Sequence, residues 1–270
     1  MIVGSPGVGK SVLTVLLCFH LATKFRIPVI FARQLKGENG PQQKSVIICI
    51  RPGGEAVGYP KKPEDGVDMK AISADFGRQF GDPVRTKTVL DGWSQQELSL
   101  TAVGADFGGF HLLATSAQYR RKSQDTRLLV SLPAWKEENL RKLGEYRGLL
   151  ESDIDERLFH SGGSAREFLR PTIDEIRRRI KEAIASITEE NCKGLLAGYG
   201  GSIGMGFDTL RRCYLSGESE NSYMDPACWE FIVDSPYALR SLRTKAPFDV
   251  FERALAIAKS SGRAHYGWAF

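Results

Sequence analysis

Gly4-Ser5-Pro6-Gly7-Val8-Gly9-Lys10-Ser11 carries the strongest pattern in the sequence. It fits G-x-x-x-x-G-K-[ST], in which glycines let backbone N–H groups turn toward phosphate oxygens without a Cβ in the way. The pattern requires a strand before it and a helix after it. Residues 11–25 are apolar and free of glycine and proline, which predicts that helix. Its N-terminus would add a partial positive charge beneath a phosphate. The stretch therefore predicts a phosphate-binding loop between a strand and a helix.

The strand before the loop is short. Only Met1-Ile2-Val3 is present, whereas a buried parallel strand usually runs about five or six residues. We therefore expect the chain to be a fragment or a truncated gene model, without a targeting segment of its own.

The residue types within the loop predict its ligands. Lys10 is expected to reach the β- and γ-phosphates of a nucleoside triphosphate, and the Ser11 hydroxyl to ligate Mg²⁺. The expected cofactors are ATP or GTP with Mg²⁺, and the sequence does not choose between the two bases. The residues expected to contact the nucleotide are Gly4, Ser5, Pro6, Gly7, Val8, Gly9, Lys10, Ser11 and Val12.

A second polar residue is needed because such sites hold Mg²⁺ with a carboxylate at the end of a neighbouring strand. Residues 86–92 form a short β-favouring run that ends in Asp91-Gly92. Asp91 is our candidate for the metal carboxylate. The alternative is a plain turn at the end of the strand, because Asp-Gly is common in turns.

Further strands and one helix are predicted between the loop and residue 134. The strands are at 27–32, 45–50, 110–116 and 126–132, and the helix is at 68–80. Thr115 and Ser116, at the end of one strand, either contact the γ-phosphate or cap a helix. Arg120-Arg121-Lys122 is either a solvated basic turn or, as in related ring-forming ATPases, supplies an arginine to a neighbour's nucleotide. The second reading predicts a homo-oligomer.

From residue 134 onward the periodicity becomes helical. Helices are predicted at 137–150, 152–160, from 165 and at 173–187, the last with a stripe of isoleucines. The fold class expected is α/β, with a parallel sheet of about five strands in the order 5-1-4-3-2 of AAA- and STAND-like ATPases. The expected regions are a P-loop core at 1–134, a helical lid at 135–195 and an α-rich C-terminal region at 196–270 that continues beyond the chain end.

Composition excludes several other classes of protein. The chain has 270 residues, 42% of them hydrophobic and 26% charged, which is typical of a folded protein. The longest apolar stretch, Val12 to Ala22, falls short of the roughly 20 residues of a membrane span, so no membrane association is expected. A net charge of +5 does not by itself indicate nucleic-acid binding. The five scattered cysteines predict buried thiols rather than a disulfide framework or a zinc site.

Several motifs together resemble the P-loop module of Crinkler effectors, which are related to the retrotransposon hot spot proteins of trypanosomes. The resemblance covers most of residues 1–170, with a weaker echo at 267–270. Its most specific part is Ser161-Gly162-Gly163-Ser164-Ala165-Arg166-Glu167-Phe168. The other motifs are the phosphate loop, Val89-Leu90-Asp91-Gly92-Trp93, Leu113-Ala114-Thr115-Ser116 and Leu132-Pro133-Ala134-Trp135.

The resemblance implies a setting and a set of roles. Crinklers are secreted into a host cell and many act in its nucleus, which implies a host nuclear protein or DNA as partner. The family's phosphate-loop, metal and lid roles fall on Lys10, Ser11, Asp91 and Arg166 in this sequence. Arg166 would then reach the γ-phosphate from the lid, and the alternative is an ordinary arginine at the start of a helix.

One departure from related ATPases bears on activity. A glutamate that activates water usually follows the metal aspartate directly, whereas Gly92 and Trp93 follow Asp91 here. Glu97 is the nearest carboxylate downstream and is our candidate general base. Three functions are therefore open: an NTP-hydrolysing module, a nucleotide-dependent switch that does not hydrolyse, and a small-molecule kinase, in which Gly-x-Pro-Gly-x-Gly-Lys loops also occur.

Overall fold

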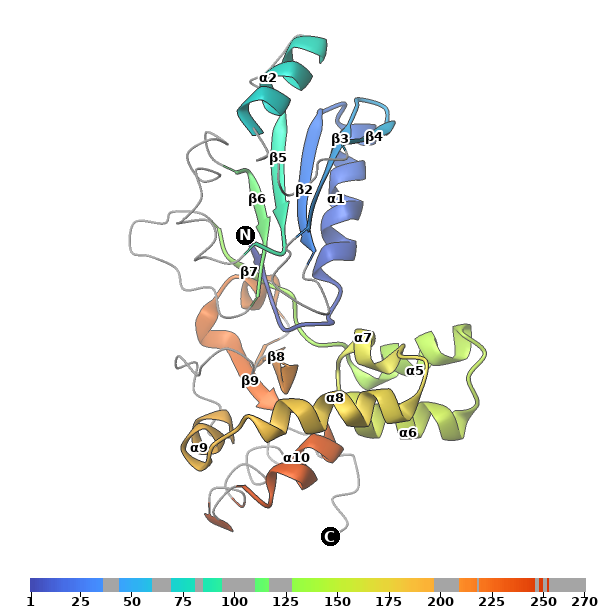
Figure 1. The fold of residues 1–270 in the computed structure, drawn as a ribbon, viewed down its shortest axis with the longest axis vertical. Coiled ribbons are helices and arrows are strands. Elements are labelled where there is room, and N and C mark those ends of the chain that lie inside the picture. Colours follow the sequence, from blue (N-terminus) through green and yellow to red (C-terminus); the bar gives the residue numbers. More distant parts are fainter. Residues whose placement is uncertain are drawn as a thin grey trace. The chain divides into compact units, whose positions relative to one another are not determined.

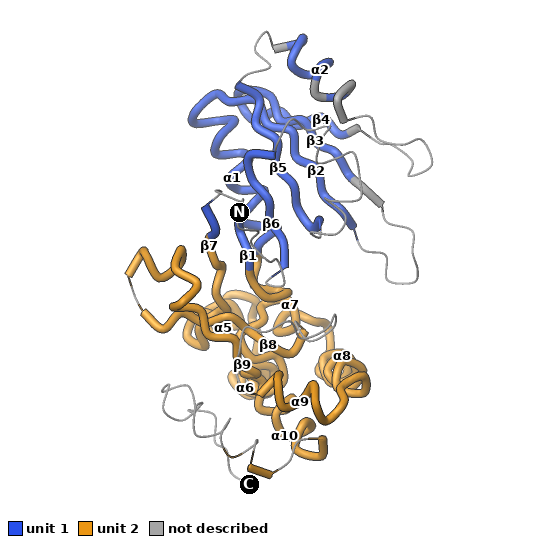
Figure 2. The backbone as a smooth tube through the Cα atoms, turned by 90° about the vertical axis from the view of Figure 1, so that its left-hand side faces the viewer, with its two compact units in different colours: residues 1–3, 10–129 blue, residues 4–9, 130–270 orange. Residues whose placement is uncertain are grey.

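The computed structural model describes residues 1–35, 44–59, 69–80, 85–93, 110–116, 128–196, 209–217 and 219–245, together with 248, 249 and 252. The chain forms two compact units, shown in Figure 2. The first comprises residues 1–3 and 10–129, and the second comprises residues 4–9 and 130–270. The fold is mixed α/β, and the described residues contain a mostly parallel main sheet of seven strands.

Six of these strands, labelled β1 to β6 in Figure 1, lie in the first unit. Their order is β4-β3-β2-β5-β6-β1. The strands β2, β5, β6 and β1 pair in parallel, whereas β3 and β4 extend the sheet with antiparallel pairs. Their bounds are β1 Ile2–Val3, β2 Val29–Leu35, β3 Lys44–Ile50, β4 Ala56–Tyr59, β5 Lys87–Asp91 and β6 Leu112–Ala114.

The strands predicted from the sequence around 27–32, 45–50, 86–92 and 110–116 are all present, with ends displaced by up to three residues. The strand β4 was not predicted. It is short, contains Gly58, and its described side chains are half-buried or exposed. Its sequence therefore lacks the run of alternating apolar and polar residues that predicts a strand. It forms because β3 offers an edge to pair with.

The helix α1 (Lys10–Lys24) follows the glycine-rich loop at residues 4–9, as predicted. It lies along β2 and β3 in Figure 1, and its buried residues Cys18 and Ala22 pack on Val29, Phe31 and other apolar residues of the sheet. Fully burying a side chain such as Val29 or Phe31 contributes about 1.5–3 kcal/mol, so this contact stabilises the packing of the helix on the sheet. In the described part of the chain, no helix combines the length and apolar character needed to span a membrane.

The first unit also contains α2 (Met69–Phe80), at the position predicted for a helix. It buries Ile72 and Phe76, one turn apart.

Four cysteines are free and buried, as the sequence predicted, and Cys228 is half-buried. Burial, with a smaller effect of the Asp91 charge, raises the pKa of Cys18 to about 12.

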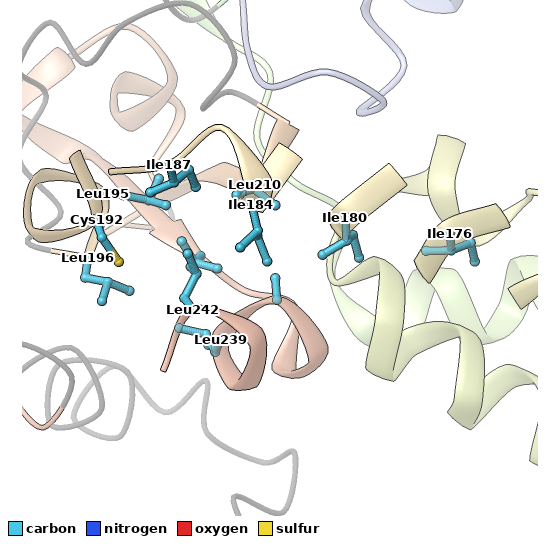
Figure 3. Packing of buried hydrophobic residues seen from close by; sticks show 12 residues of the cluster. Ile176, Ile180, Ile184, Ile187, Cys192, Leu195, Leu196, Leu210, Leu239 and Leu242 are labelled. Atoms are coloured by element: carbon cyan, nitrogen blue, oxygen red, sulfur yellow. The ribbon is translucent and has the colours of Figure 1, made fainter. Parts of the chain in front are cut away.

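The longer segment of the second unit begins with β7 (Val130–Ser131) and is mainly helical. The isoleucine stripe of α8 is buried against α9 and α10, as Figure 3 shows for Ile184, Leu239 and Leu242. The helix predicted at 137–150 ends earlier, because Gly148 adopts a φ of +71° that helical residues do not. The helices are α5 Glu137–Tyr146, α6 Glu151–Ser161, α7 Ala165–Phe168, α8 Ile173–Ala185, α9 Glu189–Leu196 and α10 Pro236–Leu242.

The C-terminal part of this unit also contains β structure that the sequence did not predict. The strands β8 (Arg211–Leu215) and β9 (Trp229–Val233) form an antiparallel pair, in a region expected to be α-rich. One hydrophobic cluster joins α8 and α9 to Leu210, Val233 and α10. The predicted lid and C-terminal region therefore share a core, and residues 130–270 belong to one compact unit together with residues 4–9.

Candidate functional site

The register of the first-unit sheet places Asp91 at the end of β5. Asp91 pairs with Ala114 of β6, which in turn pairs with Ile2 of β1. The parallel strands β1, β5 and β6 therefore end at one edge of the sheet, where ligands of open α/β sheets bind. Asp91 is buried there, with 3% of its surface exposed.

Ser11 and Asp91, predicted separately from the sequence, contact each other. The Ser11 hydroxyl donates a hydrogen bond to Asp91 Oδ1 over 3.1 Å. Ser11 lies in the first turn of α1, directly after Lys10. The fold thus brings the last residue of the loop motif to a carboxylate that is 80 residues away in sequence.

The second carboxylate oxygen of Asp91 is less well satisfied. Arg33 Nε lies 3.3 Å from Asp91 Oδ2, because Arg33 and Asp91 are paired in the parallel strands β2 and β5. The geometry is that of an ion pair, and Oδ2 accepts no hydrogen bond from the described residues. A buried carboxylate oxygen without a donor costs free energy, and a bound cation would remove that cost.

Gly92 explains why no glutamate follows Asp91. Its φ is +81°, and a Cβ built there would lie 2.8 Å from the backbone oxygen of Gln34 on β2. Any other residue would need a strained φ and a displaced strand. The sequence departure at this position is therefore enforced by the sheet.

The two candidate phosphate sensors lie directly after β6. The Thr115 hydroxyl donates to the carbonyl oxygen of Trp93 over 2.8 Å, and its backbone N–H donates to Ile2. Thr115 is buried, and Ser116 is half-buried. The Thr115 hydroxyl proton thus ties β6 to the chain that follows Asp91, a bond that neither predicted alternative included.

Other predicted residues lie outside this arrangement. The Val12 side chain is on the first turn of α1 and is 65% exposed. The candidate base Glu97 and the basic run Arg120-Arg121-Lys122 lie outside the described residues, so their roles stay predictions.

The loop residues 4–9 make their described contacts within the second unit. The backbone N–H of Cys213 on β8 donates to Ser5 Oγ over 3.1 Å, and Trp135 Nε1 donates to the Val8 carbonyl over 2.9 Å. Gly4 lies so close to Leu132 that a Cβ would stand 2.5 Å from the Leu132 carbonyl oxygen. The loop is therefore held in place by contacts with Leu132, Trp135 and Cys213.

Arg166 also lies against the loop. Its backbone N–H donates to the Gly7 carbonyl over 3.2 Å. A Cβ on Gly7 would stand 2.2 Å from Ser164 Oγ and 3.0 Å from Arg166 Cβ. The Ser164 side chain caps α7 by accepting from the Glu167 N–H. The Gly-Gly-Ser-x-Arg-Glu-Phe element thus packs on the glycine-rich loop, and Arg166 is the second residue of α7.

Gly7 provides a direct test of this packing. Its φ of +85° and its contact with Ser164 leave no room for a methyl group. We expect Gly7→Ala to lower the midpoint of thermal unfolding and to weaken the nucleotide binding predicted from the sequence at least about tenfold, since the loop must separate from α7.

The matched control is Gly148→Ala. Gly148 also has a positive φ of +71°, but no described atom lies within 4 Å of its Cβ position. It should show only the cost of backbone strain, with nucleotide affinity unchanged. Equal nucleotide affinity in both variants would contradict a role for the Gly7 contact.

The site includes residues to which the sequence assigned no role. Arg33, Trp135, Ser164 and Cys213 contact Asp91 or the loop. Trp135 and Ser164 belong to motifs of the Crinkler resemblance, which was a usable signal. Nothing in the sequence marked Arg33 or Cys213, because their contacts depend on strand register and on pairing of the backbone.

Comparison with models of known protein families and with curated proteins found no significant match. The functional argument is therefore carried by the geometry and by the sequence motifs.

Proposed function

We propose that this chain is a Mg²⁺-dependent nucleoside-triphosphate-binding module of the P-loop class, with ATP or GTP as ligand and hydrolysis as its activity. The observation that carries the proposal is the hydrogen bond from Ser11 to the buried Asp91. A phosphate-loop hydroxyl next to a strand-end carboxylate is the donor set that such sites use. A chance glycine-rich turn would not require this partner.

The donor set at Ser11 and Asp91 suits Mg²⁺. Both residues offer oxygen atoms, and Asp91 Oδ2 is buried without a described hydrogen-bond donor. No cluster of three or more His, Cys, Asp or Glu side chains able to hold a metal exists among the described residues. Mg²⁺ is commonly held by one or two protein ligands together with waters and substrate phosphates, and Ser11 and Asp91 would supply those two ligands. When bound, the ion neutralises charge on the phosphates.

The chain's own residues provide the rest of the site. The glycine loop leads directly into α1, whose 15 residues place a helix N-terminus at Lys10 and Ser11. Lys10 supplies a fixed positive charge for the β- and γ-phosphates. The order of the parallel strands supports the P-loop class. Counted along the chain, β1, β2, β5 and β6 are the first to fourth parallel strands. Their order β1-β6-β5-β2 therefore reads 1-4-3-2, which matches four positions of the 5-1-4-3-2 order.

A second candidate function is a switch that binds nucleotide without hydrolysing it. Gly92 favours it, since the sheet leaves no room for a glutamate directly after Asp91. In the switch reading, nucleotide state would be read through α7, whose Arg166 touches Gly7. In the hydrolysing reading, Glu97 would be the base.

The sequence resemblance extends the proposal to a biological setting. We propose that the module belongs to a secreted Crinkler-type effector that acts in the host nucleus, with a host nuclear protein or DNA as partner. This part of the proposal rests on the motifs alone.

The test is equilibrium binding of ATP and of GTP to the full chain, with Mg²⁺ and with a chelator, together with phosphate release from the same samples. Saturable binding that Mg²⁺ strengthens is expected. Phosphate release would select the hydrolysing module, and Mg²⁺-strengthened binding without release would select the switch. Absence of binding to both nucleotides would overturn the proposal.

A further inference from the structure

The C-terminal β8–β9 pair contacts the phosphate loop through a chain of polar contacts. One contact is direct, from the Cys213 N–H of β8 to Ser5 Oγ. A second route begins at Asp234, the residue that follows β9. Nucleotide chemistry at the loop does not by itself require either.

Asp234 holds the glycine turn before α7. Its Oδ2 accepts hydrogen bonds from the Gly163 N–H and from the Tyr214 hydroxyl, each over 2.6 Å. A Cβ on Gly162, whose φ is +53°, would stand 2.3 Å from Asp234 Oδ1. The turn is therefore pressed onto the carboxylate, and only glycine permits that approach.

The Gly162–Gly163 turn also sets the position of α7. Ser164 follows Gly163 directly, and Ser164 Oγ stands 2.2 Å from the Cβ position of Gly7. Arg166, two residues further, donates its backbone N–H to the Gly7 carbonyl. A shift of the turn would thus be passed to the middle of the phosphate loop.

The surroundings of Asp234 fit a fixed structural contact. Burial raises the pKa of its carboxyl, against the opposing effects of the Arg212 charge and of the hydrogen bonds from Tyr214 and Gly163. Both hydrogen bonds go to the same oxygen, so a neutral side chain of the same shape retains them.

We propose that Asp234 is a positioning residue for the phosphate loop, so that the β8–β9 pair sets nucleotide affinity through the Gly162–Gly163 turn and α7. This inference rests on the proposed nucleotide binding. Asp234 acts through other residues and is not a catalytic residue.

The experiment measures ATP affinity of the full chain in the presence of Mg²⁺, at a temperature where every variant is folded by circular dichroism. Asp234→Ala removes both hydrogen bonds and is expected to weaken ATP binding about tenfold. Asp234→Asn keeps an acceptor oxygen at the same place and is expected to stay within about threefold of the wild type. This rescue separates positioning from a need for charge.

The stability control is Leu242→Ala. Leu242 is fully buried in the hydrophobic cluster formed by α8, α9 and α10 in the same unit, and none of the described members of that cluster belongs to the loop. It should lower the unfolding midpoint and leave ATP affinity unchanged. If Asp234→Ala does not fold, Tyr214→Phe takes its place, because it removes one hydrogen bond at constant shape and is expected to weaken binding about threefold.

Each outcome separates the two proposals. A wild-type chain that binds no nucleotide overturns the proposed function itself. A wild type that binds, with Asp234→Ala binding equally well, overturns the positioning role alone. Equal weakening in Asp234→Ala and Leu242→Ala also overturns it, since the effect would then follow stability.

Discussion

Lys10→Ala is expected to weaken binding of ATP and GTP about ten- to hundredfold, because it removes a charge-assisted hydrogen bond to the phosphates. Phosphate release by a hydrolysing protein should fall at least about hundredfold, since the lost charge acts most strongly on the transition state. Titration calorimetry gives the affinity, and a phosphate-release assay gives the rate.

The control for this variant lies on the same helix. Lys24 is in the last turn of α1 and is exposed. Lys24→Ala makes the same change in net charge and helix composition, at the other end. It should bind nucleotide like the wild type. A Lys10→Ala protein that binds as tightly as Lys24→Ala would argue against a phosphate-binding loop at residues 4–11.

The second large effect is expected from Asp91→Asn. This change preserves shape, so the Ser11 hydroxyl can still find an acceptor, but it removes the negative charge that a divalent cation needs. Mg²⁺ should then lose most of its strengthening effect on nucleotide binding. Any Mg²⁺-dependent turnover should fall at least about hundredfold. Nucleotide affinity measured over a series of Mg²⁺ concentrations, with a chelator-treated sample as the point without Mg²⁺, checks this prediction.

The matched control is Asp75→Asn, because Asp75 is on α2 in the same unit and half of its side chain is exposed. Its Mg²⁺ dependence should equal that of the wild type. Asp91→Asn also leaves Arg33 without its ion-pair partner, but Arg33 is 41% exposed and can be solvated. If nucleotide binding by Asp91→Asn depends on Mg²⁺ as it does in the wild type, Asp91 is not a metal ligand and belongs only to a plain turn at the end of the strand.

The two variants act in different ways, which helps to interpret them together. Lys10→Ala should reduce affinity at every Mg²⁺ concentration, whereas Asp91→Asn should reduce mainly the difference between Mg²⁺ and chelator. Variants with the same profile would indicate general damage to the loop.

Much of the candidate site could be predicted from the sequence because its elements have local signatures. The pattern from Gly4 to Ser11 identifies the loop through the steric freedom of glycine and the fixed spacing of a lysine and a hydroxyl. The run before Asp91 predicts a strand through its β-favouring residue types, and the isoleucines at helical spacing from Ile173 onward reflect the 3.6-residue period of a helix. Both are properties of the chain itself, and the structure contains the strand and the helix that they predict.

The predictions were least accurate where an element depends on a distant partner. β8 and β9 are strands that pair with each other. Trp229, Phe231, Ile232 and Val233 of β9 are residue types that favour strands, a signal that the prediction of an α-rich region did not use. The predicted end of α5 was too late in the sequence. A glycine can either continue a helix or end it, and Gly148 ends this one because the turn that follows imposes a positive φ.

The sequence alone determined the phosphate-loop motif, the helix that follows it, the parallel strands and the candidate residues Lys10, Ser11, Asp91 and Arg166. Only the tertiary structure decided that Ser11 bonds to Asp91, that β2 closes the space beside Gly92, and that Asp234 holds the turn before α7. The physical reason is range. Steric and periodic preferences act between neighbours in sequence, whereas these contacts follow from strand register and close packing of segments up to 80 residues apart.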